Sequence, residues 1–521
     1  MNQLRQREAT ERRLGFALVC GAALLAYVRS FAVPFQFDDF DQIVSNPAMQ
    51  APTLAAVFAW GRARVIPFAT LVLDYQIGGE ATFGYHVVSF AVHLLTTFFV
   101  FRLALALGDT PRLRGTWFAE RRLALATAAA LIFACHPIQV QAVTYIVQRA
   151  TSVAAMFYVG SVFFYVVGRN CGLAAGRGGV AAYVTALLFA LAAFLSKENT
   201  ATLPFAIVLT EVVFYGGLTR RVAMRLVPFV AFVAVIPLAW ALLWPHPADE
   251  SLPVRLELLT HRMALAVDSA ARSSPEEYFL TQCLVIPRYL WLVLFPSGFN
   301  VDHDVPVARA FSTSIAAGLA LLAGLLAFGL YTVRRWPLVG FGLLWMFLTL
   351  AVESSFIPIA DVMMEHRMYL PMVGVALVLG TGFAWMVTQA PRAAFVAGGV
   401  LAMALVVLTA ARNEVWRSPL ALWQDALAKS PGKARVHLNV GTILHQEGRL
   451  KEAIPYYCKA LELEPENKLA RANLTLLLDQ RLDSDLEEGD ANDGDEGIDL
   501  TLETANEKLK LLVPTDPCKR Q

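Results

Sequence analysis

Three aspartates, Asp38, Asp39 and Asp41, lie within the short stretch FQFDDFDQIVSN (35–46). This stretch directly follows one of the most apolar segments of the chain. Carboxylates at a membrane boundary are costly unless water solvates them or they bind something. One carboxylate can act as a general base toward a hydroxyl group, and several can help to hold a divalent cation. The structural alternative is that they cap the following segment or solvate a loop end.

The composition predicts an all-α, polytopic membrane protein with a polar part attached. Of the 521 residues, 57% are hydrophobic and 16% are charged, whereas soluble domains carry about 25% charged residues. The net charge of +1 gives no reason to expect a nucleic-acid partner. Eleven apolar stretches have spanning length: 14–33, 84–106, 122–138, 150–168, 179–195, 200–217, 226–244, 311–333, 338–352, 368–389 and 393–411.

Basic loop residues predict the orientation of these spans. Arginines cluster before the first span, between the second and third, and after the fourth, sixth and eighth: Arg12 and Arg13, Arg112 to Arg122, Arg169 and Arg177, Arg220 to Arg225, and Arg334 and Arg335. A twelfth apolar stretch, 279–296, contains Pro287 and Arg288 and is expected to be broken. If it is re-entrant or interfacial, every cluster faces the cytoplasm. The N-terminal run is then a retained anchor rather than a signal peptide, with the N-terminus inside and the C-terminus outside.

The same orientation gathers the polar, non-basic motifs on the outer side. They are FDDFD (37–41), HPIQVQ (136–141), SKEN (196–199), VDHD (301–304) and the stretch ESSFIPIADVMMEHRMYLP (353–371). Ionisable groups clustered at span ends on one side predict an active site at the outer leaflet. No Walker motif, HExxH motif or nucleophile elbow occurs in the sequence, which argues against ATP-driven transport and a membrane protease.

The C-terminal part has a different composition and predicts a short helical-repeat domain. Pro431 and Pro465 are 34 residues apart, the period of a tetratricopeptide repeat. The repeat positions between them are occupied by Val440, Gly441, Leu444, Ala453, Tyr457 and Ala460. The predicted organisation is a membrane domain over 1–413, a repeat domain over 414–480, and an acidic, largely disordered tail over 481–521.

Several of these motifs resemble a known family. The stretches FDDFDQIVSNP, RVIPFATLVLDYQIGG, FACHPIQVQAVTYIVQRATSVAAMF, LSKENTATLPF and EHRMYLPMVG, followed by repeats, are similar in order to the transmembrane and tetratricopeptide-repeat-containing O-mannosyltransferases and their bacterial relatives. The resemblance implies a GT-C-type membrane glycosyltransferase fold and a lipid-phosphate sugar donor. This sequence has Ile66-Pro67 where the family has Arg-Pro, with Arg64 nearby, and Gln141 where a glutamate is often found.

The chemistry implied by a polyprenyl-phosphate donor needs one base and several cations. Phosphate is a good leaving group, so a single carboxylate with inversion at the sugar carbon suffices. Asp38 or Asp39 is the predicted base, with a slight preference for Asp39. The predicted ligands of the lipid phosphate are Arg149, Lys197, Arg367 and His136. The alternatives are a Lys197–Glu198 pair, an Arg367 salt bridge with Glu365 or Asp361, and a structural role for His136.

A further set of polar residues is predicted to contact substrate: Asp41, His86, Glu198, Asp302, His303, Asp304, Glu353, Glu365 and His366. No cofactor is certain. Asp38 and Asp39 together with Asp302, His303 and Asp304 could bind Mg²⁺ or Mn²⁺. The alternative for 302–304 is a polar loop beside a sugar pocket.

These observations predict a glycosyltransferase of the bacterial inner membrane, with its active site and repeats in the periplasm. It would move a sugar from a polyprenyl phosphate to Ser/Thr of an acceptor polypeptide that the repeats engage. A lipid or surface glycan is the alternative acceptor. Two other classes stay open: a lipid flippase, which predicts charges at the bilayer midplane, and a membrane-anchored repeat scaffold.

Overall fold

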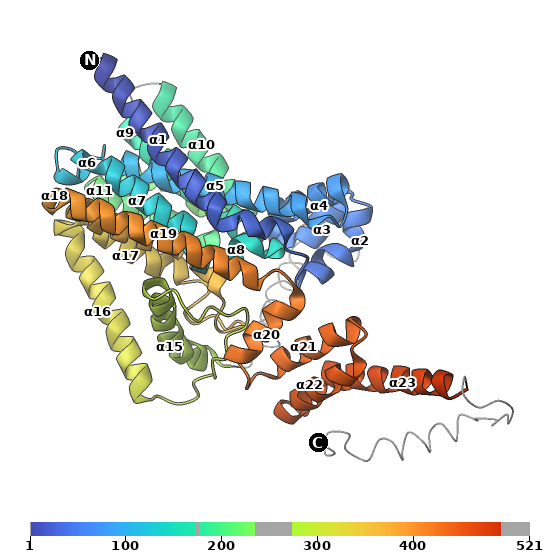
Figure 1. Cartoon of the computed structure of the whole chain (residues 1–521). Helices are drawn as coiled ribbons and strands as arrows, with labels where there is room; N and C mark the ends of the chain where they lie inside the picture. Colours follow the sequence, from blue (N-terminus) through green and yellow to red (C-terminus); the bar gives the residue numbers. More distant parts are fainter. Residues whose placement is uncertain (1, 173–176, 235–272, 491–521) are drawn as a thin grey trace, which may run out of the picture. The chain divides into compact units, whose positions relative to one another are not determined.

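The protein is all-helical over the residues that its computed structural model describes, which are 2–172, 177–234 and 273–490. Within these ranges the chain forms helices and connecting loops and no strand (Figure 1). It divides into two compact units. The first contains Met1–Phe299 and Val305–Arg417, and the second contains Asn300–Asp304 and Ser418–Gln521. The predicted fold class, a helical membrane protein with a C-terminal repeat, is confirmed.

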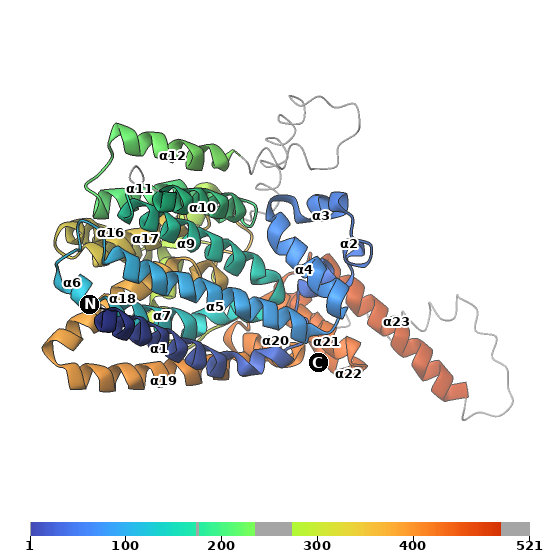
Figure 2. The same ribbon diagram turned by 90° about the horizontal axis from the view of Figure 1, so that it is seen from above.

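The first unit is a bundle of long apolar helices. They are α1 (Asn2–Tyr27), α5 (Thr82–Leu107), α7 (Arg122–Cys135), α9 (Arg149–Asn170), α10 (Arg177–Phe194), α11 (Leu203–Phe214), α12 (Arg220–Val233), α15 (Pro275–Leu294), α16 (Thr313–Arg335), α17 (Pro337–Leu350), α18 (Pro371–Gln389) and α19 (Pro391–Val415). Helix α9 packs against α5 and α10, while α7 packs against α5 and α18. Seen from above, the helices form successive layers from α12 to α19 (Figure 2).

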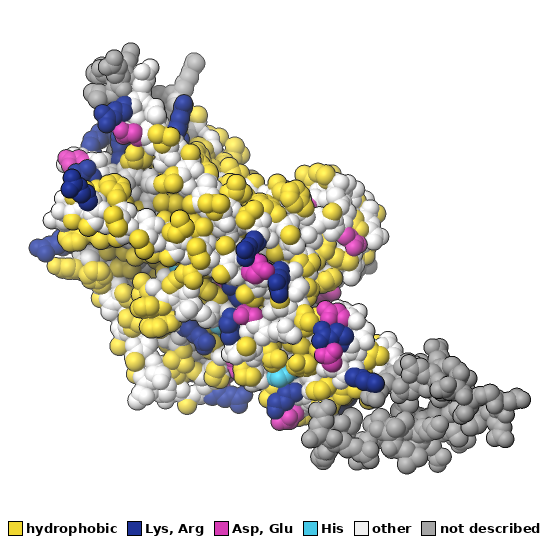
Figure 3. Space-filling view, in the orientation of Figure 1, with side chains coloured by type: hydrophobic (Ala, Val, Ile, Leu, Met, Phe, Trp, Pro, Cys, Tyr) yellow, Lys and Arg dark blue, Asp and Glu magenta, His cyan; other side chains and the backbone are white. Residues whose placement is uncertain are grey.

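The surface of this unit has the apolar character expected of a membrane protein. Figure 3 shows hydrophobic side chains spread over the helical bundle, with Lys and Arg gathered at the end that holds the N-terminus. Leu14, Val396 and Met403 are each more than three-fifths exposed, a position that suits lipid contact. Within the ranges that the structure describes, six helices are long and apolar enough to cross a membrane, or seven if α7 and the following bent segment Pro137–Thr144 form one span. The expected eleven crossings stay a prediction, and the expected span 226–244 lies partly outside the described residues.

The expected break at Pro287 is wrong, because α15 runs continuously from Pro275 to Leu294. A proline inside a helix leaves the carbonyl four residues earlier without its helical partner, which here is Cys283. That carbonyl lies against Gly318 of α16, so closely that a Cβ at Gly318 would overlap it. The absence of a side chain at Gly318 therefore leaves room for this carbonyl between α15 and α16.

Short helices fill the long first loop, which the sequence patterns did not indicate. They are α2 (Pro47–Gln50), α3 (Leu54–Gly61) and α4 (Val65–Gly78), and they lie together at one end of the bundle (Figures 1 and 2). The side chains of Asn46 and Thr53 cap α2 and α3. The loop has an apolar core of its own that includes Phe35, Ile43, Met49, Phe68, Tyr85 and Ile146. This core fixes the segment that carries Asp38 and Asp39.

The second unit has the predicted repeat. Its helices are α20 (Pro419–Lys429), α21 (Ala434–Gln446), α22 (Leu450–Leu463) and α23 (Lys468–Asp490). The predicted repeat positions Val440, Leu444, Ala453, Tyr457 and Ala460 are all buried between these helices. Helix α23 continues to Asp490, so the first residues of the acidic tract are helical rather than disordered. Leu and Glu in that part of the tract favour helix, and 491–521 lie outside the described residues.

Two glycines allow α17 and α18 to approach each other closely, and this contact can be tested. A Cβ at Gly374 of α18 would overlap the carbonyl oxygen of Gly342 of α17, whereas Gly382, also on α18, has open space around it. We expect Gly374→Ala to lower the free energy of unfolding by about 1–3 kcal/mol, because the two helices must separate. Gly382→Ala is the matched control and should be neutral or slightly stabilising. The midpoint of thermal unfolding in detergent measures both, and equal midpoints would contradict the contact.

Candidate active site

Asp39 links the first loop to the short helical turn just before α9. Its carboxylate is fully buried. One carboxylate oxygen accepts a hydrogen bond from the backbone N–H of Val147, and the other accepts from that of Gln36, both at 2.9 Å. Burial raises the pKa of Asp39 to about 7, and the two backbone N–H groups limit this rise. Phe37, two residues before, has a φ of 46°, a strained value for a non-glycine residue that these bonds help to maintain.

Asp38 and Asp41 are more accessible than Asp39. The side chain of Asp38 is half-buried, and that of Asp41 is exposed. The backbone N–H of Asp38 donates to the hydroxyl of the buried Tyr145 at 2.9 Å, which fixes the position of this residue. A substrate can reach Asp38 more directly than Asp39, whose two oxygens both accept backbone hydrogen bonds. Asp38 is therefore the more accessible of the two carboxylates, and the role of either one as the base stays a prediction.

Arg149, a predicted phosphate ligand, is fully buried and surrounded by protein acceptors. Its guanidinium forms an ion pair with Asp74 at 2.5 Å and donates to the Ser89 hydroxyl at 3.0 Å. It also donates to the Tyr85 carbonyl at 2.7 Å and to the Thr70 hydroxyl at 3.2 Å. A phosphate would have to displace these groups. Binding by Arg149 stays a prediction, and the contacts favour a structural role that anchors α4 and α5 to α9.

A second polar cluster forms around Lys197 and Glu353. The buried ammonium of Lys197 pairs with Glu353 at 2.8 Å and donates to the Thr151 hydroxyl at 3.0 Å. The amide of Asn199 donates to the other carboxylate oxygen of Glu353 at 3.1 Å. Burial alone would raise the pKa of Glu353, but the positive charges of Lys197 and Arg367 outweigh it and hold the value at about 2. Burial lowers the pKa of Lys197, and Glu353 opposes this shift.

Glu198 pairs with Arg64 at 3.1 Å, and this ion pair is the accessible part of the cluster. The Arg64 side chain is 50% exposed and that of Glu198 is 38% exposed, whereas Lys197 is 6% exposed. The backbone N–H of Ile66 donates to the carbonyl of Leu195 at 3.2 Å and holds the two segments together. Arg64 is thus the cation in this cluster that a soluble or lipid-borne anion can reach most easily.

Arg367 and His366 come from the helical turn Glu365–Met368 before α18. The guanidinium of Arg367 donates to the backbone carbonyl of Asp361 at 2.5 Å and to the Tyr278 hydroxyl at 3.2 Å. The backbone N–H of His366 donates to the side-chain oxygen of Gln141 at 2.8 Å. Burial lowers the pKa of His366, and the nearby positive charge of Lys197 adds to this shift. These contacts join the motifs 136–141, 196–199 and 353–371.

Three other predicted residues of the first unit have protein partners. His136 Nδ1 accepts from the backbone N–H of Ile138, so Nε2 carries the proton and donates to the Val293 carbonyl at 3.0 Å. His86 contacts the Val33 carbonyl through Nε2 at 2.8 Å. Glu365 is buried and lies 3.9 Å from Arg412. These bonds fit structural roles, and their predicted substrate contacts stay predictions.

Asp302, His303 and Asp304 belong to the second unit. The Asp302 carboxylate forms ion pairs with Lys433 and with Arg435, the latter at 2.6 Å. Burial would raise the pKa of Asp302, but these cations hold it below its usual value. The carbonyl of His303 accepts from Lys433 at 3.2 Å. Within the described ranges, no group of three or more His, Cys, Asp or Glu side chains is arranged to hold a metal ion.

Asp74, Thr151, Asn199, Tyr145 and Tyr278 bind the predicted site residues but were not themselves predicted. Asp74 had a detectable signal, since it is the lone acid in the apolar stretch VIPFATLVLDYQIG. Hydroxyls such as Thr151 and the two tyrosines give no such signal, because their types and spacing are common in membrane helices.

Comparison with known proteins fits both parts of the structure, a helical membrane unit and a repeat unit. A tetratricopeptide-repeat model matches residues 434–467. The chain is 26% identical over 524 residues to "Protein O-mannosyl-transferase TMTC1" of Homo sapiens, covering 88% of this chain and 56% of that protein. It is 22% identical to "Protein O-mannosyl-transferase F38B6.6" of Caenorhabditis elegans, covering 86% of this chain and 62% of that protein. It is 25% identical to "Protein O-mannosyl-transferase TMTC4" of Homo sapiens, covering 84% and 65%.

The resemblance found in the motifs is therefore confirmed over most of the chain. These relatives are named as protein O-mannosyltransferases, which supports a membrane glycosyltransferase at the level of class. The chain spans less than two thirds of the length of each of them.

The raised pKa of Asp39 predicts a pH-dependent stability difference. An ordinary Asp has a pKa near 3.9, so the folded state binds a proton that the unfolded state has released at intermediate pH. The wild type should lose stability as the pH rises from about 4 to 7, and Asp39→Asn should not. The free energy of unfolding of the wild type, relative to that of Asp39→Asn, should fall by on the order of 2–4 kcal/mol over this pH range. Thermal unfolding at pH 5 and pH 8 measures the difference, with exposed Asp41→Asn as control. A relative stability that grows with pH would contradict the assignment.

The Lys197–Glu353 pair predicts a large effect from removing one charge. Glu353→Gln leaves the buried ammonium of Lys197 without its counter-ion, and we expect a loss of about 3–5 kcal/mol. Glu198→Gln breaks the more exposed pair with Arg64 and should cost less than about 1 kcal/mol. Adding Lys197→Met to Glu353→Gln should recover part of the loss. Thermal unfolding in detergent compares the three variants, and indistinguishable effects of Glu353→Gln and Glu198→Gln would refute the difference.

Proposed function

We propose that this protein is a GT-C-type glycosyltransferase that moves a sugar from a polyprenyl phosphate to the hydroxyl of Ser or Thr in a polypeptide. The observation that carries the proposal is the joining of two polar clusters by the short helical turn Ile146–Gln148 and the first turn of α9 that follows it. Val147 of the short turn binds Asp39, and Thr151 in the first turn of α9 binds Lys197. The arrangement supports the transfer because it places a carboxylate base and an accessible cation at the same end of the bundle.

The proposed reaction is a single displacement. The carboxylate of Asp38 takes the proton of the acceptor hydroxyl, and the hydroxyl oxygen forms a bond to the anomeric carbon of the sugar. The bond from that carbon to the phosphate oxygen breaks, with inversion, and the lipid phosphate leaves with the electron pair. No general acid is required, because the phosphate anion is a stable leaving group.

Arg64 is the proposed first contact for the departing phosphate. Its guanidinium is half exposed and can exchange the Glu198 carboxylate for a phosphate in the same bidentate manner. Lys197 and Arg367 lie deeper and supply positive potential from fixed positions, since protein oxygens already bind both. Arg64 would thus contact the phosphate directly, while Lys197 and Arg367 would stabilise its negative charge through their electrostatic potential.

The proposed setting is the periplasmic side of a bacterial inner membrane. The polar clusters and the N-terminal arginine cluster are separated by the length of α1, which matches an outer active site and a cytoplasmic N-terminus. The repeat unit is proposed to engage the acceptor polypeptide, as tetratricopeptide helices present extended surfaces for peptides. The names of the relatives support mannose as the sugar.

The proposal is tested by separate substitution of the three first-loop aspartates. Asp38→Asn should abolish hexose-sized additions to envelope proteins, because loss of a general base typically costs about 10²–10⁴ in rate. Asp39→Asn should also reduce them by disturbing the position of Asp38. Asp41→Asn, at an exposed position that is predicted to contact substrate rather than to take the proton, should reduce the additions less than Asp38→Asn does. Intact mass of envelope proteins in cells, with the protein's level followed in parallel, measures the outcome.

Two outcomes of these experiments would contradict the proposed glycosyl transfer. Unchanged glycoforms in both Asp38→Asn and Asp39→Asn, at normal protein levels, would overturn the transferase. If deletion of 414–521 alone removed the protein's cellular effect while both aspartates were dispensable, the chain would be a membrane-anchored repeat scaffold.

A further inference from the structure

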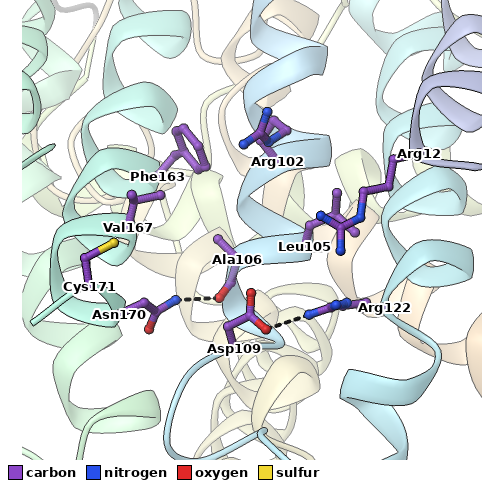
Figure 4. Close-up of a pocket in the computed structure, with 10 residues that line it drawn as sticks. All are labelled: Arg12, Arg102, Leu105, Ala106, Asp109, Arg122, Phe163, Val167, Asn170 and Cys171. Atoms are coloured by element: carbon purple, nitrogen blue, oxygen red, sulfur yellow. Dashed lines mark hydrogen bonds and ion pairs between the residues drawn. The ribbon is translucent and has the colours of Figure 1, made fainter. Parts of the chain in front are cut away.

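A cavity of about 190 Å³ lies at the opposite end of the first unit from the candidate active site. Its walls come from the start of α1, the end of α5, the start of α7 and the end of α9 (Figure 4). Three arginines line it, Arg12, Arg102 and Arg122, together with a single acid, Asp109. The cavity is smaller than the about 300–1,000 Å³ of typical small-molecule sites, so it suits one compact anionic group.

Among the described residues, the arginines that line this cavity outnumber the carboxylates that pair with them. Arg122 pairs with Asp109 at 2.5 Å and lies 3.8 Å from Glu8, and Arg12 pairs with Glu8 at 3.2 Å. Two carboxylates therefore face three guanidinium groups. Within the described part of the chain, Arg102 contacts two aromatic rings and pairs with no carboxylate.

The guanidinium of Arg102 lies beside two aromatic rings at the cavity. It lies on α5 five residues before the last residue, Leu107, and its guanidinium is 5.5 Å from the ring centres of both Phe98 and Phe163. Phe98 is one turn further from the helix end. Helical side chains lean toward the N-terminal end of their helix, so the contact with Phe98 is the ordinary direction, whereas the contact with Phe163 brings the guanidinium across to α9. Arg102 lines the cavity between these two helices (Figure 4).

We propose that this cavity binds the phosphate of an anionic membrane phospholipid. Arg102 donates to the phosphate oxygens in its planar fork, and Arg12 and Arg122 add positive potential from the other side. Phe98 and Phe163 stack on the guanidinium and orient it. The exposed apolar side chains of Leu14 and Leu18 on α1 let the acyl chains remain in the bilayer, so the headgroup alone enters the cavity. Basic pockets between membrane helices bind lipid headgroups in this manner.

This site is independent of the proposed glycosyl transfer. Its arginines are at the end of the bundle that holds the N-terminus, while Asp38, Lys197 and Arg64 are at the other end. Its test therefore needs no sugar donor or acceptor.

The test measures which lipid the purified full-length chain retains. After purification and detergent exchange, native mass spectrometry counts bound phosphatidylglycerol and phosphatidylcholine, each added at the same concentration. We expect the wild type to retain phosphatidylglycerol preferentially and Arg102→Ala to bind it at least about tenfold more weakly. Arg102→Lys should be intermediate, because lysine keeps the charge but lacks the fork. Exposed Arg221→Ala, at the start of α12, is the matched control and should bind as wild type does.

A thermal-unfolding titration separates a lipid from a free anion. Phosphatidylglycerol should raise the unfolding midpoint of the wild type and of Arg221→Ala, but not that of Arg102→Ala. Inorganic phosphate alone should not reproduce this shift, and a full shift with phosphate would overturn the lipid assignment. Equal retention of phosphatidylglycerol by wild type and a folded Arg102→Ala protein would overturn the site itself.

Discussion

The hydrogen bond from the Val147 N–H to the Asp39 carboxylate is the contact on which the candidate site depends. It joins the first loop to the residues just before α9, and it limits the rise in the pKa of Asp39 that burial causes. Within the next turn Arg149 binds Asp74, and Thr151 binds Lys197. One short segment therefore positions the acid and the basic parts of the site together, so a shift at the start of α9 would displace both.

Desolvation decides which charged groups stay available for chemistry. Arg149 and Lys197 are out of water, and such charges are tolerated only when protein groups satisfy them. Their carboxylate partners, Asp74 and Glu353, occupy the positions beside these cations that a phosphate would need for direct contact. Arg64 remains half exposed and keeps the capacity to exchange its partner. The same physical rule thus separates cations that hold the fold from the cation best placed to meet a ligand, although all were similar candidates by residue type.

Close backbone approach at a few glycines contributes to holding the bundle that carries these groups, beside its buried apolar side chains. Lipid tails are as apolar as leucine, so membrane helices gain little from burying hydrophobic side chains against each other. Gly342 and Gly374 let α17 meet α18, and Gly318 lets α16 meet α15 beside Pro287. At these contacts there is no room for a Cβ atom, so the helices are held at a fixed separation beneath the loops at their ends. The glycines gave no signal of this role in the sequence, because small residues are frequent in all membrane helices.

The sequence by itself determined the helical class, the apolar helices and the repeat, since each rests on local periodicity or on a 34-residue spacing that survives without tertiary contacts. It also predicted that the polar motifs 37–41, 136–141, 196–199, 301–304 and 353–371 would gather on one side of the membrane. The tertiary structure alone decided the partners within that gathering: Lys197 pairs with Glu353 rather than with its neighbour Glu198. Adjacent residues on a chain point in different directions, and the choice of an ion-pair partner depends on which distant segment packs alongside. That long-range packing leaves no periodic trace in the sequence.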